Sequence, residues 1–179
     1  MEERSVVKIG IVGAESTGKS RLCEELAKHY KTVWAPEYAR EYFNDSDIYN
    51  YTLEDLVTIA KKQIELEQQF LSKATRFLFC DTTLITLKIW AELEFQKTPE
   101  YIEERLKKTK YDFYLITDNQ IAWTEDPLRQ NKYSRDLLFE MNLAEVKKSG
   151  IPHAVVSGTD QNRLKNAVAI IDAFSTKEF

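Results

Sequence analysis

The chain has 179 residues, of which 43% are hydrophobic, so it is long enough for a substantial core and too apolar for a disordered protein. Its formal charge is −4 with acids and bases interspersed, which argues against a nucleic-acid partner, because a phosphate backbone favours a clustered basic face. We find no signal peptide, no apolar run long enough for a bilayer and no CxxC motif around its two cysteines, so we expect a cytoplasmic protein that does not bind a membrane.

The first half of the chain alternates between short apolar runs and helical patterns. Residues 6–12 and 76–81 are apolar runs typical of buried strands, and residues 33–35 form a shorter strand candidate. Residues 20–30 carry apolar side chains at helical spacing. Thr52 followed by Asp55 has the pattern of a capping box, which predicts the start of a long helix.

The second half continues the alternation. We expect helices at 83–95, 99–108, 136–148 and about 160–174, with strands at 113–117 and 153–158. Strands that alternate with helices predict a parallel sheet covered on both faces. The predicted fold is therefore α/β: one domain over residues 1–179, with three layers around a five-stranded parallel sheet.

The segment GAESTGKS at residues 13–20 matches G-x-x-x-x-G-K-[ST], the phosphate-binding loop, and lies between a predicted strand and a predicted helix. Its backbone amides form an anion site at the helix N-terminus, while Lys19 reaches the phosphates and Ser20 ligates Mg²⁺. We therefore predict a P-loop NTPase fold that uses ATP and Mg²⁺. The residues expected to contact the nucleotide are Gly13, Ala14, Glu15, Ser16, Thr17, Gly18, Lys19, Ser20 and Arg21.

Asp81 ends the predicted strand 76–81, at the sheet edge where ligands collect in such folds. Its carboxylate is the expected second contributor to the Mg²⁺ site, with Thr82 and Thr83 in support. The alternative is that Asp81 only caps the helix that follows.

The segment WAPEYARE at residues 34–41 follows the second strand and is the expected acceptor side. Glu37 is placed to accept a hydroxyl proton or to hold a hydroxyl in line with the γ-phosphate, and Arg40 to contact a phosphate or orient Glu37. Tyr38 and Tyr42 line either the acceptor pocket or the core. Trp90, on the predicted helix after Asp81, has the same two possibilities, and the core is slightly favoured. A solvated charged turn would also account for residues 34–41.

Residues 118–135 are polar, lack apolar periodicity and resemble a kinase lid. Arg129 and Arg135 are the candidates to lie over the phosphates, where positive charge stabilises the transition state. Trp123 either covers the acceptor or packs against the sheet. A solvated loop is the alternative. Ser157-Gly158-Thr159 follows the last strand, with Arg163 further on, at a position that often borders an adenine in P-loop kinases; an ordinary strand–helix turn is the favoured interpretation.

These motifs in order, GAESTGKS, PEYARE, CDTTLIT and W-x₂-DPLR, resemble the ribosylnicotinamide kinase domain of the NadR type over roughly residues 6–172. The resemblance implies a nucleoside-kinase-like fold that phosphorylates the 5′-hydroxyl of nicotinamide riboside with ATP. It implies catalytic roles for Lys19, Glu37, Asp81 and Arg129. It also leads us to expect an aromatic residue immediately before Glu37, where this chain has Pro36, and the chain begins without the adenylyltransferase domain of the bifunctional proteins.

Two other functions use the same loop. A P-loop ATPase can act as a nucleotide-dependent switch for a protein partner. A GTPase is less favoured, because guanine recognition uses Asn-Lys-x-Asp after a strand and this chain has Thr117-Asp118-Asn119-Gln120.

Overall fold

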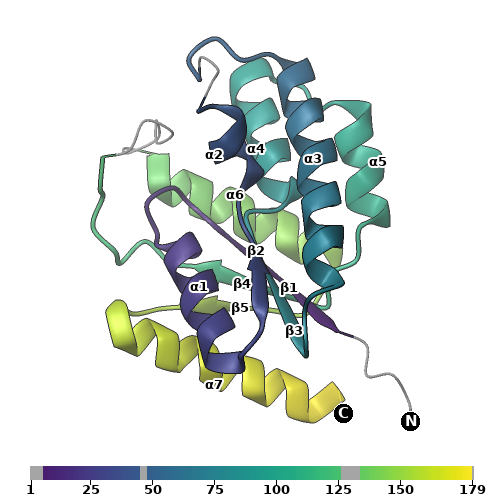
Figure 1. The fold of residues 1–179 in the computed structure, drawn as a ribbon. Coiled ribbons are helices and arrows are strands. Elements are labelled where there is room, and N and C mark those ends of the chain that lie inside the picture. The colour runs from purple at the N-terminus through teal and green to yellow at the C-terminus, as the bar shows by residue number, and fades with distance from the viewer. Residues whose placement is uncertain (1–5, 45–47, 126–133, 179) are drawn as a thin grey trace.

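The computed structural model describes residues 6–44, 48–125 and 134–178, and its five strands form one parallel sheet in the order β2-β3-β1-β4-β5 (Figure 1). The strands are β1 (Val7–Gly13), β2 (Val33–Ala35), β3 (Phe77–Asp81), β4 (Phe113–Thr117) and β5 (His153–Val156). The helices are α1 (Lys19–Tyr30), α2 (Tyr38–Tyr42), α3 (Leu53–Leu71), α4 (Leu84–Phe95), α5 (Glu100–Lys108), α6 (Arg135–Ser149) and α7 (Asp160–Glu178). The predicted α/β fold with a five-stranded parallel sheet is confirmed.

Alternation along each strand divides the core into two layers, one on each face of the sheet. In β3, Phe77 and Phe79 face α1 and α7, whereas Leu78 and Cys80 face α4 and α6. Figure 1 shows the same division, with α1 and α7 on one side of the sheet and the other helices opposite. Because the strands are buried on both faces, their sequences read as continuous apolar runs.

A third apolar cluster lies among α2, α3, α4 and α5, on the side of the sheet that carries α4. Leu56 of α3, Leu87 of α4 and Ile102 of α5 are almost fully buried in it. This cluster is built from helices rather than from the sheet, and it fixes α2 and α4 beside the carboxyl ends of β2 and β3.

Local signals set most helix boundaries. The capping box is present, because Thr52 Oγ1 accepts from the Asp55 amide and the Asp55 carboxylate accepts from the Thr52 amide at 2.7 Å. The short helix α2 was not predicted, since its five residues are too few to show a helical period. The final helix α7 extends beyond the predicted residue 174 to Glu178.

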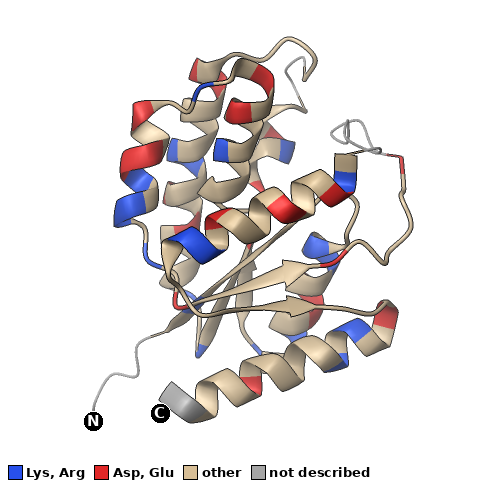
Figure 2. Cartoon of the chain, turned by 180° about the vertical axis from the view of Figure 1, so that it is seen from behind, with Lys and Arg blue, Asp and Glu red and all other residues tan. Residues whose placement is uncertain are grey.

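Charged residues of both signs are interspersed along the helices seen from behind the molecule (Figure 2). Within the described residues, the helices are either too short or too polar to cross a membrane.

Candidate active site

The phosphate-binding loop joins β1 to α1 and depends on two glycines with positive φ. Gly13 has φ of 147°, and a Cβ there would lie 2.3 Å from Thr117 Oγ1. Gly18 has φ of 73° and precedes the first residue of α1. A side chain at either position would therefore strain the backbone, and at Gly13 it would also collide with β4.

The loop is braced from behind by threonines. The Thr17 hydroxyl lies 2.6 Å from that of Thr117 on β4, and it donates to the Ala14 carbonyl at 2.8 Å. Both threonines are fully buried. These bonds hold the loop in one conformation, and its successive backbone N–H groups are of the kind that forms an anion site.

The Lys19 ammonium lies over the loop, where it donates to the carbonyls of Ala14 at 2.7 Å and Gly13 at 3.2 Å. Burial lowers the pKa of Lys19, and the negative charges of Asp81, Glu37 and Glu15 oppose that shift. The cation is therefore placed among three carboxylates at the mouth of the loop.

Ser20, at the start of α1, is hydrogen-bonded to Asp81, at the end of β3. The Ser20 hydroxyl donates to Asp81 Oδ2 at 2.5 Å, and the Asp81 side chain is 1% exposed. Burial raises the pKa of Asp81, a cost that a bound cation would offset. Asp81 does not cap α4, because Thr83 accepts from the Ile85 amide there.

These two oxygen atoms suit Mg²⁺, which takes one or two protein oxygens and completes its shell with water and phosphate. Among the described residues there is no group of three or more His, Cys, Asp or Glu side chains that would make an all-protein metal cage. A site of this kind is therefore expected to bind Mg²⁺ together with a nucleotide.

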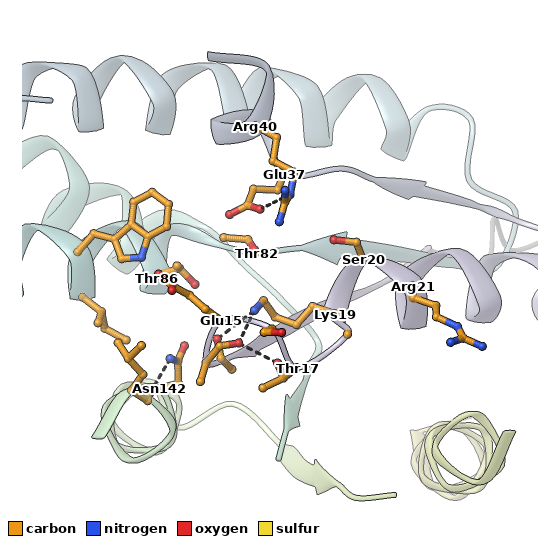
Figure 3. A pocket seen from close by; sticks show the side chains of 17 residues that line it. Glu15, Thr17, Lys19, Ser20, Arg21, Glu37, Arg40, Thr82, Thr86 and Asn142 are labelled. Carbon is orange, nitrogen blue, oxygen red and sulfur yellow. Dashed lines mark hydrogen bonds and ion pairs between the residues drawn. The ribbon is translucent and has the colours of Figure 1, made fainter. Parts of the chain in front are cut away.

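A cavity of about 250 Å³ extends from the loop toward α2, α4 and α6 (Figure 3). It brings together two predicted groups, the phosphate-binding loop with Arg21 and the acceptor pair Glu37 and Arg40. Its wall also contains Thr82, which was predicted to support the Mg²⁺ site, and residues of α4 and α6. The lining beyond the loop and acceptor pair consists of Thr82, Thr86, Ile89, Trp90, Leu138 and Asn142.

Glu37 and Arg40 lie on the side of the cavity opposite the loop (Figure 3). Arg40 Nε is 3.2 Å from Glu37 Oε2, and the Glu37 side chain is 13% exposed. Burial raises the pKa of Glu37 to about 7, as does the charge of Asp81, while Lys19 and Arg40 lower it. A carboxyl group with this pKa is suited to accept a proton near neutral pH.

Gln63 of α3, which the sequence analysis did not identify, holds the Glu37 segment from outside the cavity. Its Oε1 accepts from the Tyr38 amide at 2.8 Å, and its Nε2 donates to the Pro36 carbonyl at 3.2 Å. The side chain is 3% exposed, so these bonds are shielded from water. Gln63 is thus a positioning residue for Glu37, and its place on a helical face gave no sequence signal.

The raised pKa of Glu37 predicts a pH-dependent cost to stability. With a pKa of 4.5 when unfolded and about 7 when folded, Glu37 destabilises the native state as pH rises through that window. Glu37→Gln should therefore gain about 1–2 kcal/mol of unfolding free energy relative to wild type between pH 5 and pH 8. Urea denaturation at both pH values measures this difference.

Glu41→Gln provides the matched control, because Glu41 is an exposed glutamate on α2, the short helix that begins directly after Glu37. We expect this control to change stability by less than about 0.5 kcal/mol at either pH. An equal effect of Glu37→Gln at pH 5 and pH 8 would contradict the assigned ionisation.

The described part of the expected lid, residues 118–125, lies against the phosphate-binding loop. The Thr124 amide donates to Ser16 Oγ at 2.8 Å, and Arg135 bridges the carbonyls of Ser16 and Ile121 at 3.2 and 2.7 Å. Trp123 has a buried indole nitrogen and is not among the described residues that line the cavity. Arg129 lies outside the described residues.

The aromatic residues near the acceptor side take different places. Tyr38 and Tyr42 pack against the helical cluster of α2–α5, and neither is among the described lining residues. Trp90, for which a core position was slightly favoured, contacts that cluster and also lines the cavity.

Arg163 of α7 connects three segments at the carboxyl edge of the sheet. It donates to the Thr17 carbonyl of the phosphate-binding loop, to the Gly158 carbonyl at 2.7 Å and to the Asp118 carboxylate at 2.6 Å. Its side chain is 3% exposed, and burial lowers its pKa against the opposing charge of Asp118. The ordinary turn expected here is in fact a buried structural junction.

Several known proteins are similar to this chain in sequence or in fold. The chain is 26% identical over 145 residues to the trifunctional NAD biosynthesis/regulator protein NadR of Salmonella typhimurium, a match that covers 74% of this chain and 35% of NadR. A crystal structure of NadR protein in complex with NR superposes with a TM-score of 0.79 at 20% identity, over 95% of this chain and 52% of that one. This chain thus spans only about a third to a half of the relatives that it matches.

The same fold occurs in smaller kinases. Thymidylate kinase from Ehrlichia chaffeensis superposes with a TM-score of 0.60 at 12% identity, over 94% of this chain and 98% of that one. The predicted resemblance to NadR and to nucleoside and nucleotide kinases is therefore confirmed. Finally, the AAA domain family matches residues 8–163, which include the loop, the acceptor pair and Asp81, and the chain belongs to that family.

Proposed function

We propose that the protein is a small-molecule kinase that transfers the γ-phosphoryl group of ATP to the 5′-hydroxyl of a nucleoside-type acceptor. Nicotinamide riboside is the proposed acceptor and nicotinamide mononucleotide the product. The similarity to NadR supports this acceptor, because one relative is a NAD biosynthesis protein and solved NadR structures contain NR or NAD with AMP-PNP. Placement of the reaction in NAD biosynthesis belongs to the same proposal.

The observation that carries the proposal is the position of Glu37 and Arg40 in the same small cavity as the phosphate-binding loop. The loop amides and Lys19 bind the β- and γ-phosphates, and Arg40 neutralises charge near the transferred group. Glu37 orients the acceptor hydroxyl and takes its proton. The hydroxyl oxygen then forms a bond to the γ-phosphorus while the bond to the β-phosphate bridging oxygen breaks, and ADP leaves.

Ser20 and Asp81 are the proposed ligands for Mg²⁺. The ion, when bound, neutralises charge on the phosphates. Arg129 and Arg135 are proposed to act over the phosphates, and Trp123 and Tyr38 stay proposals as acceptor contacts. The cavity, of about 250 Å³, is of a size for a small acceptor group.

The test is ADP release with Mg-ATP over a panel of ribosides that includes nicotinamide riboside, cytidine, uridine and adenosine. We expect nicotinamide riboside to stimulate ADP release at least about tenfold over the rate without acceptor. Slow hydrolysis that no riboside changes would contradict the kinase and would favour the nucleotide-dependent switch.

A further inference from the structure

Two side chains that line the cavity each carry a buried oxygen without a hydrogen-bond partner among the described residues. These atoms are Thr86 Oγ1 and Asn142 Oδ1, on side chains that are 8% and 2% exposed. Both residues line the same cavity as Glu37. A buried polar atom left unpaired costs free energy, so a pair of them in one cavity points to a ligand that satisfies both.

The two oxygens belong to two packed helices. Thr86 and Trp90 are four residues apart on α4, and Leu138 and Asn142 are four residues apart on α6, so each pair occupies one face of its helix. Figure 3 shows Thr86 and Asn142 at the end of the cavity away from Arg21. The two helix faces together form the wall of a subsite next to Glu37.

Thr86 differs from other helical hydroxyls of the chain. Ser149, Ser175 and Thr176 each donate to a carbonyl three or four residues earlier in their own helix. Thr86 Oγ1, near the start of α4, makes no such bond and has no other hydrogen-bond partner among the described residues. Its hydroxyl is therefore available to a group in the cavity.

Asn142 has a defined orientation. Its Nδ2 donates to the Leu138 carbonyl at 2.8 Å, so its Oδ1 is left as an acceptor. The complementary ligand group needs an N–H donor for this oxygen and a second polar atom for the Thr86 hydroxyl, which both donates and accepts. A primary carboxamide carries these two functions on two atoms bonded to the same carbon, whereas a carboxylate has no N–H to donate.

We propose that Thr86 and Asn142 recognise the carboxamide of the acceptor, and that the Trp90 indole lies against the ring that carries it. This proposal rests on the proposed riboside kinase function and assigns specificity within it. Trp90 would then supply the aromatic surface that was expected at Pro36. A cationic pyridinium against that surface gains roughly a few-fold to tenfold in affinity.

The first test uses the wild-type protein and compares nicotinamide riboside with nicotinic acid riboside, which differs only by a carboxylate. We expect kcat/KM to be at least about tenfold higher for the carboxamide, because Asn142 Oδ1 and a carboxylate repel each other. Equal efficiency with the two ribosides would overturn the proposal. Failure of every riboside would instead overturn the kinase function itself.

The second test uses Thr86→Val, which keeps the side-chain shape, and Asn142→Leu. Each is expected to raise KM for nicotinamide riboside about tenfold while KM for ATP changes less than twofold, and each should reduce the preference over nicotinic acid riboside. Thr86→Ser should restore the wild-type KM, because it restores the hydroxyl. An unchanged KM for nicotinamide riboside in both variants would overturn the assignment.

Ser175→Ala is the matched control for loss of a buried hydroxyl, since Ser175 is 2% exposed on α7 and its hydroxyl bonds within its own helix. It is expected to change no kinetic parameter. Thermal unfolding of each variant separates loss of recognition from loss of folding. If Asn142→Leu does not fold, the comparison of the two ribosides on the wild-type protein still tests the proposal.

Discussion

Lys19→Ala is expected to reduce phosphoryl transfer by about 10²–10³-fold or more. Lys19 is the loop cation, held over the carbonyls of Gly13 and Ala14 and surrounded by carboxylates. Without it, negative charge on the γ-phosphate in the transition state loses its positioned counter-charge. The measurement is kcat with saturating Mg-ATP and the best riboside of the panel.

Lys28→Ala is the control for loss of a lysine from the same helix. Lys28 lies near the end of α1, where it pairs with exposed Glu24 at 2.7 Å. We expect this variant to keep the wild-type rate, because exposed pairs of this kind contribute little. A Lys19→Ala enzyme that turned over within tenfold of wild type would contradict the role of the loop in the reaction.

Glu37→Gln is expected to lower kcat by about 10²–10⁴-fold while leaving ATP affinity within about twofold. The amide keeps the size of the side chain but cannot take a proton from the acceptor hydroxyl. The proposed ATP site, the phosphate-binding loop, lies on the opposite side of the cavity, so nucleotide binding should not depend on this carboxylate. Single-turnover kinetics together with calorimetric titration of ATP measure the two effects separately.

Glu41→Gln should behave as wild type in both measurements, since Glu41 is exposed on the same helix as Arg40. Wild-type turnover in Glu37→Gln would contradict the acceptor-side assignment and would transfer proton acceptance to Asp81. A parallel loss of ATP affinity would instead indicate that Glu37 organises the phosphate-binding loop.

The sequence predicted the sheet and the phosphate-binding loop because their signals are local. The strands are short apolar runs. The loop between β1 and α1 needs glycine at positions 13 and 18 because both have a positive φ, and the motif has glycine at both positions. The capping box at Thr52 is local in the same way. Each of these features can be read within a window of a few residues.

The wall of the cavity could not be predicted, because it arises from the packing of α4 against α6. Thr86 and Asn142 are 56 residues apart; Thr86 ends the CDTTLIT motif without an assigned role, and Asn142 belongs to no motif. Trp90 was ambiguous, since an aromatic residue on an apolar helix packs in a core more often than it lines a pocket. Only the packed structure shows that these side chains face Glu37 in one cavity.

The bond pattern around Gln63 has a practical implication for mutagenesis. Its amide ties the backbone on both sides of Glu37 to the middle of α3, and Glu67, one turn further along the helix, links α3 to Lys8 and Tyr111. Substitutions along this buried polar chain would misplace the acceptor carboxylate without touching any reactant. A screen for inactive variants would therefore also identify residues that lie deep behind the sheet edge. The distance of a residue from the pocket would be a poor guide to whether catalysis tolerates its substitution.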